Sequence, residues 1–63
     1  MALLGFAIRN AKSGFYMAQD GTFSVREDKN AKLFETPQNA YKCAYDLRRK
    51  DIHAIVTEVV QED

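Results

Sequence analysis

Two tight turns divide the first half of the chain into three short apolar segments. The turns are Ala11-Lys12-Ser13-Gly14 and Gln19-Asp20-Gly21. Asp-Gly between alternating apolar residues is among the strongest hairpin signals, and it predicts a type I′ turn with positive φ at both central residues. Asn, Ser and Gly favour the first turn through local side-chain bonds and, for Gly, positive φ. The chain is therefore expected to begin as an antiparallel β-meander.

The strands of this meander are expected over residues 3–9, 15–18 and 22–26, where apolar residues recur with the period of two that indicates a half-buried strand. The residues predicted to line the core side are Phe6, Ile8, Phe15, Met17, Phe23 and Val25. The residues predicted to face solvent on the other side are Tyr16, Thr22, Ser24 and Arg26.

One helix and one further strand complete the prediction. Thr36 is placed to cap the helix and Pro37 to occupy its first turn, where a missing N–H costs nothing. A narrow stripe of mostly small residues then recurs at helical spacing: Ala40, Cys43, Ala44 and Leu47. Between meander and helix, residues 27–30 are polar, and a helical turn or short extended segment after them is expected to pack Leu33 or Phe34 on the core.

The last strand is expected over residues 52–60, which are rich in β-branched side chains on both faces. That pattern favours a more central position in the sheet than the hairpin strands have. The predicted fold is a single α+β domain over residues 1–63, with element order β-β-β-α-β and the helix on one face of the sheet.

A chain of 63 residues buries a modest share of its surface, so small domains often depend on disulfides, metals or partner chains. Cys43 is the only cysteine and His53 the only histidine, which leaves no intramolecular disulfide and no complete metal site. Neither a metal nor a cofactor is expected. Association with a second copy is the remaining stabiliser, and a homodimer is therefore one expectation.

Nine basic and nine acidic residues balance to zero, whereas nucleic-acid-binding domains usually carry a basic excess. The apolar stretches are far shorter than the roughly 20 residues that cross a bilayer, so no membrane association is expected. A free cysteine without an export signal favours a reducing cytoplasm.

Catalysis is not expected. Cys43 and His53 form the only conceivable nucleophile–base pair, but Cys43 falls on the buried stripe of the helix, where a free cysteine acts as a small hydrophobe. The three glycines, Gly5, Gly14 and Gly21, do not have the spacing of a phosphate-binding loop.

A binding surface is predicted on the outer flank of the helix, formed by Tyr41, Tyr45, Arg48 and Arg49. The two tyrosines are four residues apart and therefore lie side by side. Tyr and Arg are enriched in protein interfaces, and the same set could stack on bases and contact phosphates. Two other interpretations stay open: a homodimer interface, or rings that merely cover the margin of the sheet.

A second, alternative binding face comprises Arg9, Lys12, Tyr16 and Arg26 around the first turn. These residues would form a modest basic patch on the exposed face of the sheet. The simpler interpretation is a solvated face whose cations protect strand edges from unwanted pairing.

Four motifs stand out along the chain: the hairpin Ile8-Arg9-Asn10-Ala11-Lys12-Ser13-Gly14-Phe15-Tyr16, the turn Asp20-Gly21-Thr22-Phe23, the segment Ala31-Lys32-Leu33-Phe34, and Thr36-Pro37 before the helix. With these motifs the chain resembles small proteins of unknown function encoded by bacteriophages and prophages. The resemblance implies a non-enzymatic phage accessory protein in the host cytoplasm, which binds a host or phage protein and thereby modulates host machinery or defence. The alternative function is a nucleic-acid or nucleotide-ligand binding module.

Overall fold

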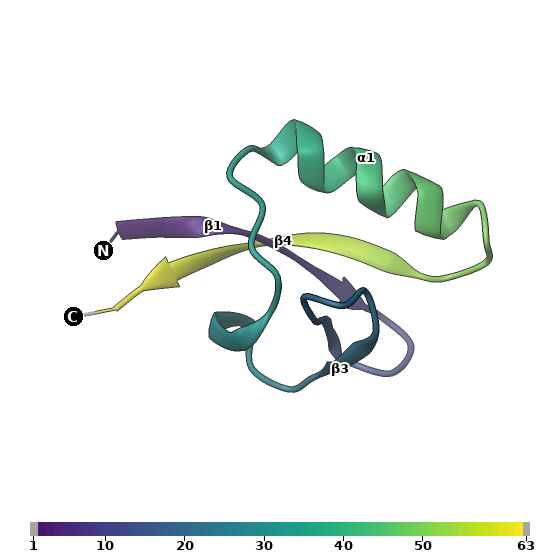
Figure 1. Cartoon of the computed structure of the whole chain (residues 1–63), viewed down its shortest axis with the longest axis horizontal. Coiled ribbons are helices and arrows are strands. Elements are labelled where there is room, and N and C mark those ends of the chain that lie inside the picture. Colours follow the sequence, from purple (N-terminus) through teal and green to yellow (C-terminus); the bar gives the residue numbers. More distant parts are fainter. Residues whose placement is uncertain (1, 63) are drawn as a thin grey trace.

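A computed structural model describes residues 2–62 and confirms the α+β fold. Its elements are β1 (Ala2–Asn10), β2 (Tyr16–Met17), β3 (Phe23–Val25), a 3₁₀ turn η1 (Asp28–Asn30), α1 (Pro37–Arg48) and β4 (Ala54–Gln61). The four strands form one antiparallel sheet in the order β3-β2-β1-β4. In Figure 1, α1 lies on one side of the long β1–β4 pair, whereas β3 and η1 lie on the other.

Both predicted turns are present, although the second differs in type. Asn10 closes the first turn, because its side-chain Oδ1 accepts a bond from the Lys12 N–H at 2.9 Å. In the second turn only Gly21 has positive φ, at 90°, and Asp20 does not. Ala18 N–H donates to Thr22 O at 2.7 Å, which closes a three-residue loop with glycine in the left-handed position. The expected type I′ turn is therefore wrong.

The predicted single core face is also wrong, because a register shift interrupts the short β2–β3 ladder. Tyr16 pairs with Val25 but Met17 pairs with Phe23, which leaves Ser24 as an extra residue on β3. Such a bulge breaks the period of two and places Phe23 and Val25 on opposite faces. Tyr16, which was expected to face solvent, is half-buried with Val25.

The core accordingly has two parts, one on each face of β1. The first core cluster lies beneath α1 and comprises Ile8, Met17, Phe23, Phe34, Cys43, Ala44, Leu47, Ala54 and Val56. The second core cluster lies on the opposite face and comprises Ala7, Tyr16, Val25, Ala31, Leu33 and Val59. Phe15, predicted to join the core, is half-buried with the Arg26 guanidinium 5.8 Å from its ring centroid.

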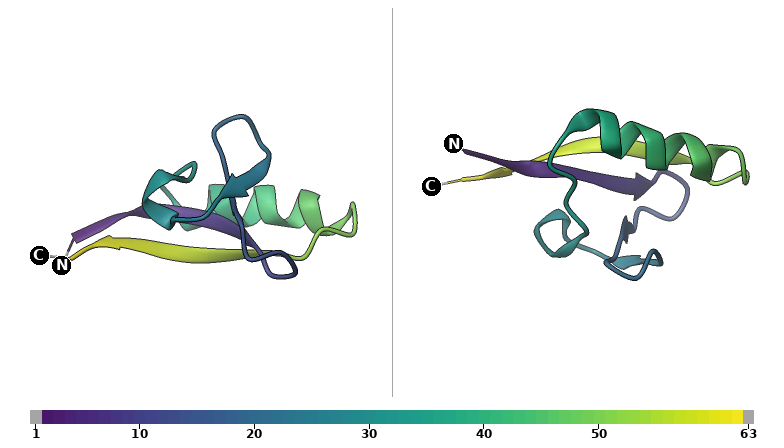
Figure 2. Two further views of the ribbon diagram at one scale, coloured as in Figure 1. Left: turned by 90° about the horizontal axis from the view of Figure 1, so that it is seen from below. Right: turned by 45° about the horizontal axis from the view of Figure 1, so that its top comes forward.

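β4 is an edge strand, which corrects the expectation of a central position. β4 has apolar residues on both faces because each face packs against a core cluster. Val56 packs in the first core cluster and Val59 in the second. Burial of both faces therefore does not require a neighbouring strand at both edges. The left view of Figure 2 shows β4 at the border of the sheet.

The connector from η1 to α1 crosses the sheet beside β1. Phe6 and Phe34 exchange two backbone hydrogen bonds, of 2.9 Å from Phe6 N–H and 2.7 Å from Phe34 N–H. Because neighbouring residues of an extended segment point to opposite faces, Leu33 reaches the second core cluster and Phe34 the first. Gly5 makes this crossing possible, since a Cβ there would lie 2.9 Å from Phe34 O.

Both ends of α1 are closed by local bonds. Thr36 caps the start as predicted, with its side-chain oxygen accepting from Asn39 N–H, and Pro37 is the first helical residue. After the helix, Asp51 adopts a φ of 65° and Ile52 N–H donates to Leu47 O at 3.1 Å. These are features of a Schellman ending, which reverses the chain so that β4 runs back beneath α1 (Figure 1).

Gly5→Ala should lower the free energy of unfolding by about 3 kcal/mol, because the new Cβ would push the connector away from β1. Gly14→Ala is the matched control: Gly14 also has positive φ, at 81°, but nothing lies within 4 Å of its missing Cβ. Its cost should be about 1 kcal/mol of backbone strain. Urea unfolding of both variants measures the difference, and equal losses would contradict the role given to Gly5.

The second turn should respond to acid through Asp20. Hydrogen bonds from the Thr22 N–H and hydroxyl lower the pKa of this carboxyl below its ordinary value of 3.8. The ionised side chain therefore stabilises the turn above that value, and the contribution disappears as pH falls through the lowered pKa. An NMR titration should show the Asp20 carboxyl and the Thr22 amide shifting together below pH 3.8. A carboxyl titrating at or above its ordinary value would contradict this role.

Candidate interaction surface

Three of the four predicted helix residues lie together on one flank of α1. Tyr41, Tyr45 and Arg48 follow the spacing i, i+4, i+7, which places them on one side of a helix. The tyrosines are 57% and 63% exposed, although large aromatic side chains usually find cover in a folded protein. We call these three residues the helix flank.

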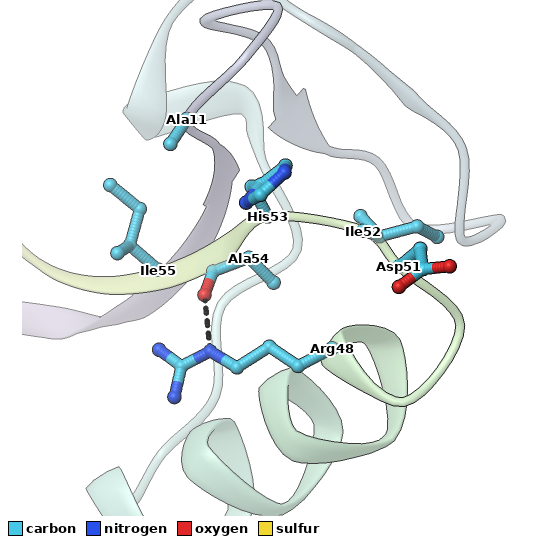
Figure 3. A pocket seen from close by; sticks show the side chains of 7 residues that line it. All are labelled: Ala11, Arg48, Asp51, Ile52, His53, Ala54 and Ile55. Atoms are coloured by element: carbon cyan, nitrogen blue, oxygen red, sulfur yellow. Dashed lines mark hydrogen bonds between the residues drawn. The ribbon is translucent and has the colours of Figure 1, made fainter.

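Arg48 anchors the end of the helix flank to the sheet. Its Nε donates a partly buried hydrogen bond of 2.9 Å to the carbonyl oxygen of Ala54, the first residue of β4 (Figure 3). A guanidinium held at one nitrogen keeps its other donors available for a partner. The helix flank therefore lies above β4, on the open side of the sheet.

Arg49 is separated from the other three. It follows the last helical residue, and its backbone N–H donates to Tyr45 O at 3.1 Å. Its side chain borders a different hollow, together with Asp46 and Lys50. The grouping of all four predicted residues on one surface is thus only partly reproduced, because Arg49, still in helical conformation, lies about 100° around the helix from Arg48.

A shallow furrow of about 640 Å³ runs along the helix flank. Besides the three flank residues, it is bordered by Gln38, Lys42 and Asp46, which the sequence reasoning did not single out. Gln38, Lys42 and Asp46 follow one another at a spacing of four, and Gln38 and Lys42 each precede a tyrosine by three residues. That helical spacing was the available signal. Aromatic residues within a polar, mixed-charge rim are the usual composition of a protein interface.

The alternative face around the first turn has a different structure from the one expected. Arg9 and Tyr16 are paired across β1 and β2, but the Tyr16 ring contributes to the second core cluster. Lys12 is exposed in the turn, and the guanidinium of Arg26 lies over the Phe15 ring. This face therefore offers dispersed cations and a half-buried tyrosine, without a free aromatic surface.

The Cys43–His53 pair is not assembled into a shared pocket. Cys43 packs in the first core cluster, whereas His53 is exposed beside a cavity of about 300 Å³ to which Cys43 does not contribute. Figure 3 shows the side chains that line this cavity: Ala11, Arg48, Asp51, Ile52, His53, Ala54 and Ile55. Within residues 2–62, no group of three or more His, Cys, Asp or Glu is placed to hold a metal ion.

Among the helices in residues 2–62, none has the length and apolar character needed to span a membrane. Comparison of the chain with protein-family models, curated proteins and solved structures finds no significant match. The chemistry of the helix flank is consequently the principal guide to function.

Arg48→Ala should lower the free energy of unfolding by about 1 kcal/mol, because it leaves the Ala54 carbonyl without its side-chain donor. Arg49→Ala is the matched control, since it removes the same charge from the neighbouring position and no side-chain hydrogen bond. Thermal unfolding of both variants measures the contrast. An equal loss of stability in the two would show that charge near the helix end, and not the bond to β4, is responsible.

Proposed function

We propose that this chain is a small non-enzymatic accessory protein of bacteriophage type that binds a protein partner through the helix flank. The observation that carries the proposal is the exposure of Tyr41 and Tyr45 side by side, next to an arginine held in place by β4. Exposed aromatic residues that cluster, rather than scatter, mark interaction sites. Tyr and Arg are also the residues most often found at the energetic centre of interfaces.

The phage origin is proposed from the hairpin, turn and connector motifs at residues 8–16, 20–23 and 31–34. A protein of this kind would act in the cytoplasm of the host cell, by occupying a surface of a host or phage protein. Its own structure supports binding in preference to catalysis: Cys43 serves the core and His53 lies apart from it. The partner is expected to present an apolar surface for the tyrosines and a carboxylate or carbonyl group for Arg48.

Tyr45→Ala should reduce capture of the partner at least about fivefold, as expected for an interface residue that contributes more than about 1 kcal/mol. The experiment immobilises the tagged chain, passes lysate of the bacterial host that also contains the untagged chain over it, and quantifies each bound protein. Because Tyr45 is 63% exposed, the substitution should leave the thermal unfolding temperature almost unchanged.

Lys29→Ala is the control for this measurement, since Lys29 is exposed in η1 on the other side of the sheet. It should retain the captured protein at the level of the unmodified chain. If every captured protein binds the Tyr45→Ala variant as well as the original, the helix flank is not the binding surface.

A further inference from the structure

The outer edge of β4 exposes a row of free backbone groups directly beneath the helix flank. Ala11 N–H donates to His53 O, so the odd-numbered residues that follow His53 direct their backbone groups towards β1. The even-numbered residues therefore point outwards. Ala54, the first of these, is already satisfied, because its carbonyl accepts from Arg48 and its N–H donates to Ile52 O.

Within residues 2–62, the outward groups without a partner are the N–H and C=O of Val56, Glu58 and Val60. Proteins usually protect such an edge with proline, lysine, a bulge or a very short strand. β4 has none of these devices: it is eight residues long, contains neither Pro nor Lys, and its register shift against β1 falls on the β1 strand at Leu4. An open and regular edge of this kind is suited to pairing with another strand.

We infer that the strand that pairs with this edge is β4 of a second copy, antiparallel and centred on Thr57. The inference rests on the proposed function and names the partner of the helix flank. A two-fold axis through Thr57 places Val56 of one copy opposite Glu58 of the other and gives four backbone hydrogen bonds. An axis through Glu58 would oppose the two Glu58 carboxylates, which destabilises a strand pair.

The Thr57 side chain faces its own equivalent in this register. Its Oγ1 is covered within one copy and has no hydrogen-bond partner in the part of the chain that the structure describes. Around an axis at Thr57, the two threonines form a pair without backbone bonds, in which Cα atoms are only about 4.5 Å apart. Threonine pairs at such positions stabilise two adjoining strands, so this register is compatible with the side chain at its centre.

The position of α1 fits the same arrangement. The helix packs on both β1 and β4. Two helices related by the axis would thus lie about two strand spacings apart, roughly 10 Å, which is the distance at which helices pack. Arg48 lies over Ala54, and α1 runs in the opposite direction to β4. The strand advances about 10 Å from Ala54 to Thr57, and about seven residues of helix, counted back from Arg48, cover the same distance. Tyr41 therefore lies beside the axis, and the exposed tyrosines of both copies cover one another.

The charges are compatible with this pairing. The chain carries no net charge, so two copies do not repel each other over long distances. Antiparallel strands bring the end of one β4, with Glu62 just beyond it, alongside the beginning of the other. The segment just before β4 carries three cations, Arg48, Arg49 and Lys50, and one carboxylate, Asp51. Acidic and basic ends are thereby matched at both sides of the axis.

Sedimentation analysis should give twice the chain mass of 7.2 kDa for the unmodified protein. Glu58→Pro should raise the dimer dissociation constant at least about tenfold, because it removes an outward N–H and leaves the bonds to β1 intact. Glu58→Ala keeps that N–H and should leave the dimer unchanged. Tyr41→Ala should weaken the dimer as well, whereas Lys29→Ala should not.

Cross-linking tests the register without depending on the proline variant. In a Cys43→Ala background, Thr57→Cys should form an intermolecular disulfide readily on mild oxidation, because the two residues face each other at the axis. Ile55→Cys should not, since its equivalents lie on either side of the axis. A disulfide through Glu58→Cys in place of Thr57→Cys would overturn the assigned register.

A monomeric mass at the highest soluble concentration, or a dimer that Glu58→Pro does not weaken, would overturn the inference. The proposed function would be decided separately. The proposed function fails only if the capture of every protein, whether a second copy or a host protein, is independent of Tyr45. A monomer that captures a host protein through Tyr45 would overturn the dimer and leave the proposed function intact.

Discussion

The pairing of Phe34 with Phe6 is the interaction on which the rest of this structure depends. β2 is only two residues long and is paired with β1 through Arg9 and Tyr16, so most of that side of β1 needs another partner. The connector provides it, and in doing so sends Leu33 and Phe34 to opposite faces of the sheet. Both core clusters are therefore tied to one crossing, which a side chain larger than hydrogen at Gly5 would obstruct.

The sequence predicted the elements better than it predicted their packing. Local signals determine turns and caps, and for that reason the turn at Asn10–Gly14 and the Thr36–Pro37 helix start were both correct. The faces on which the β3 side chains lie could not be predicted. A single extra residue, Ser24, places Phe23 and Val25 on opposite faces of the sheet instead of the same one. The edge position of β4 was equally inaccessible, since its apolar pattern reports cover of its faces and not of its edges.

In the candidate surface too, the features set by local sequence were predicted and those set by contacts between elements were not. Helical spacing was sufficient to group Tyr41, Tyr45 and Arg48, because residues four and seven apart share one side of any helix. It did not separate Arg49 from the others, although the same helical geometry turns Arg49 about 100° from Arg48 and towards a neighbouring hollow. The bond from Arg48 to Ala54, which relates the helix flank to the edge of β4, joins two elements across a loop and has no signature in the sequence.

The long β1–β4 ladder pairs Ala2 with Gln61 and Asn10 with Ala54, so it joins the first and the last strand of the sheet in sequence order. Hairpins and single helices close within microseconds, whereas contacts between distant segments must first overcome the entropy of closing a long loop. The meander and α1 should consequently form and dissolve many times before the ladder closes over them. A nascent chain on the ribosome would lack its longest strand pair until the residues of β4 have emerged, and this domain should fold only after that point.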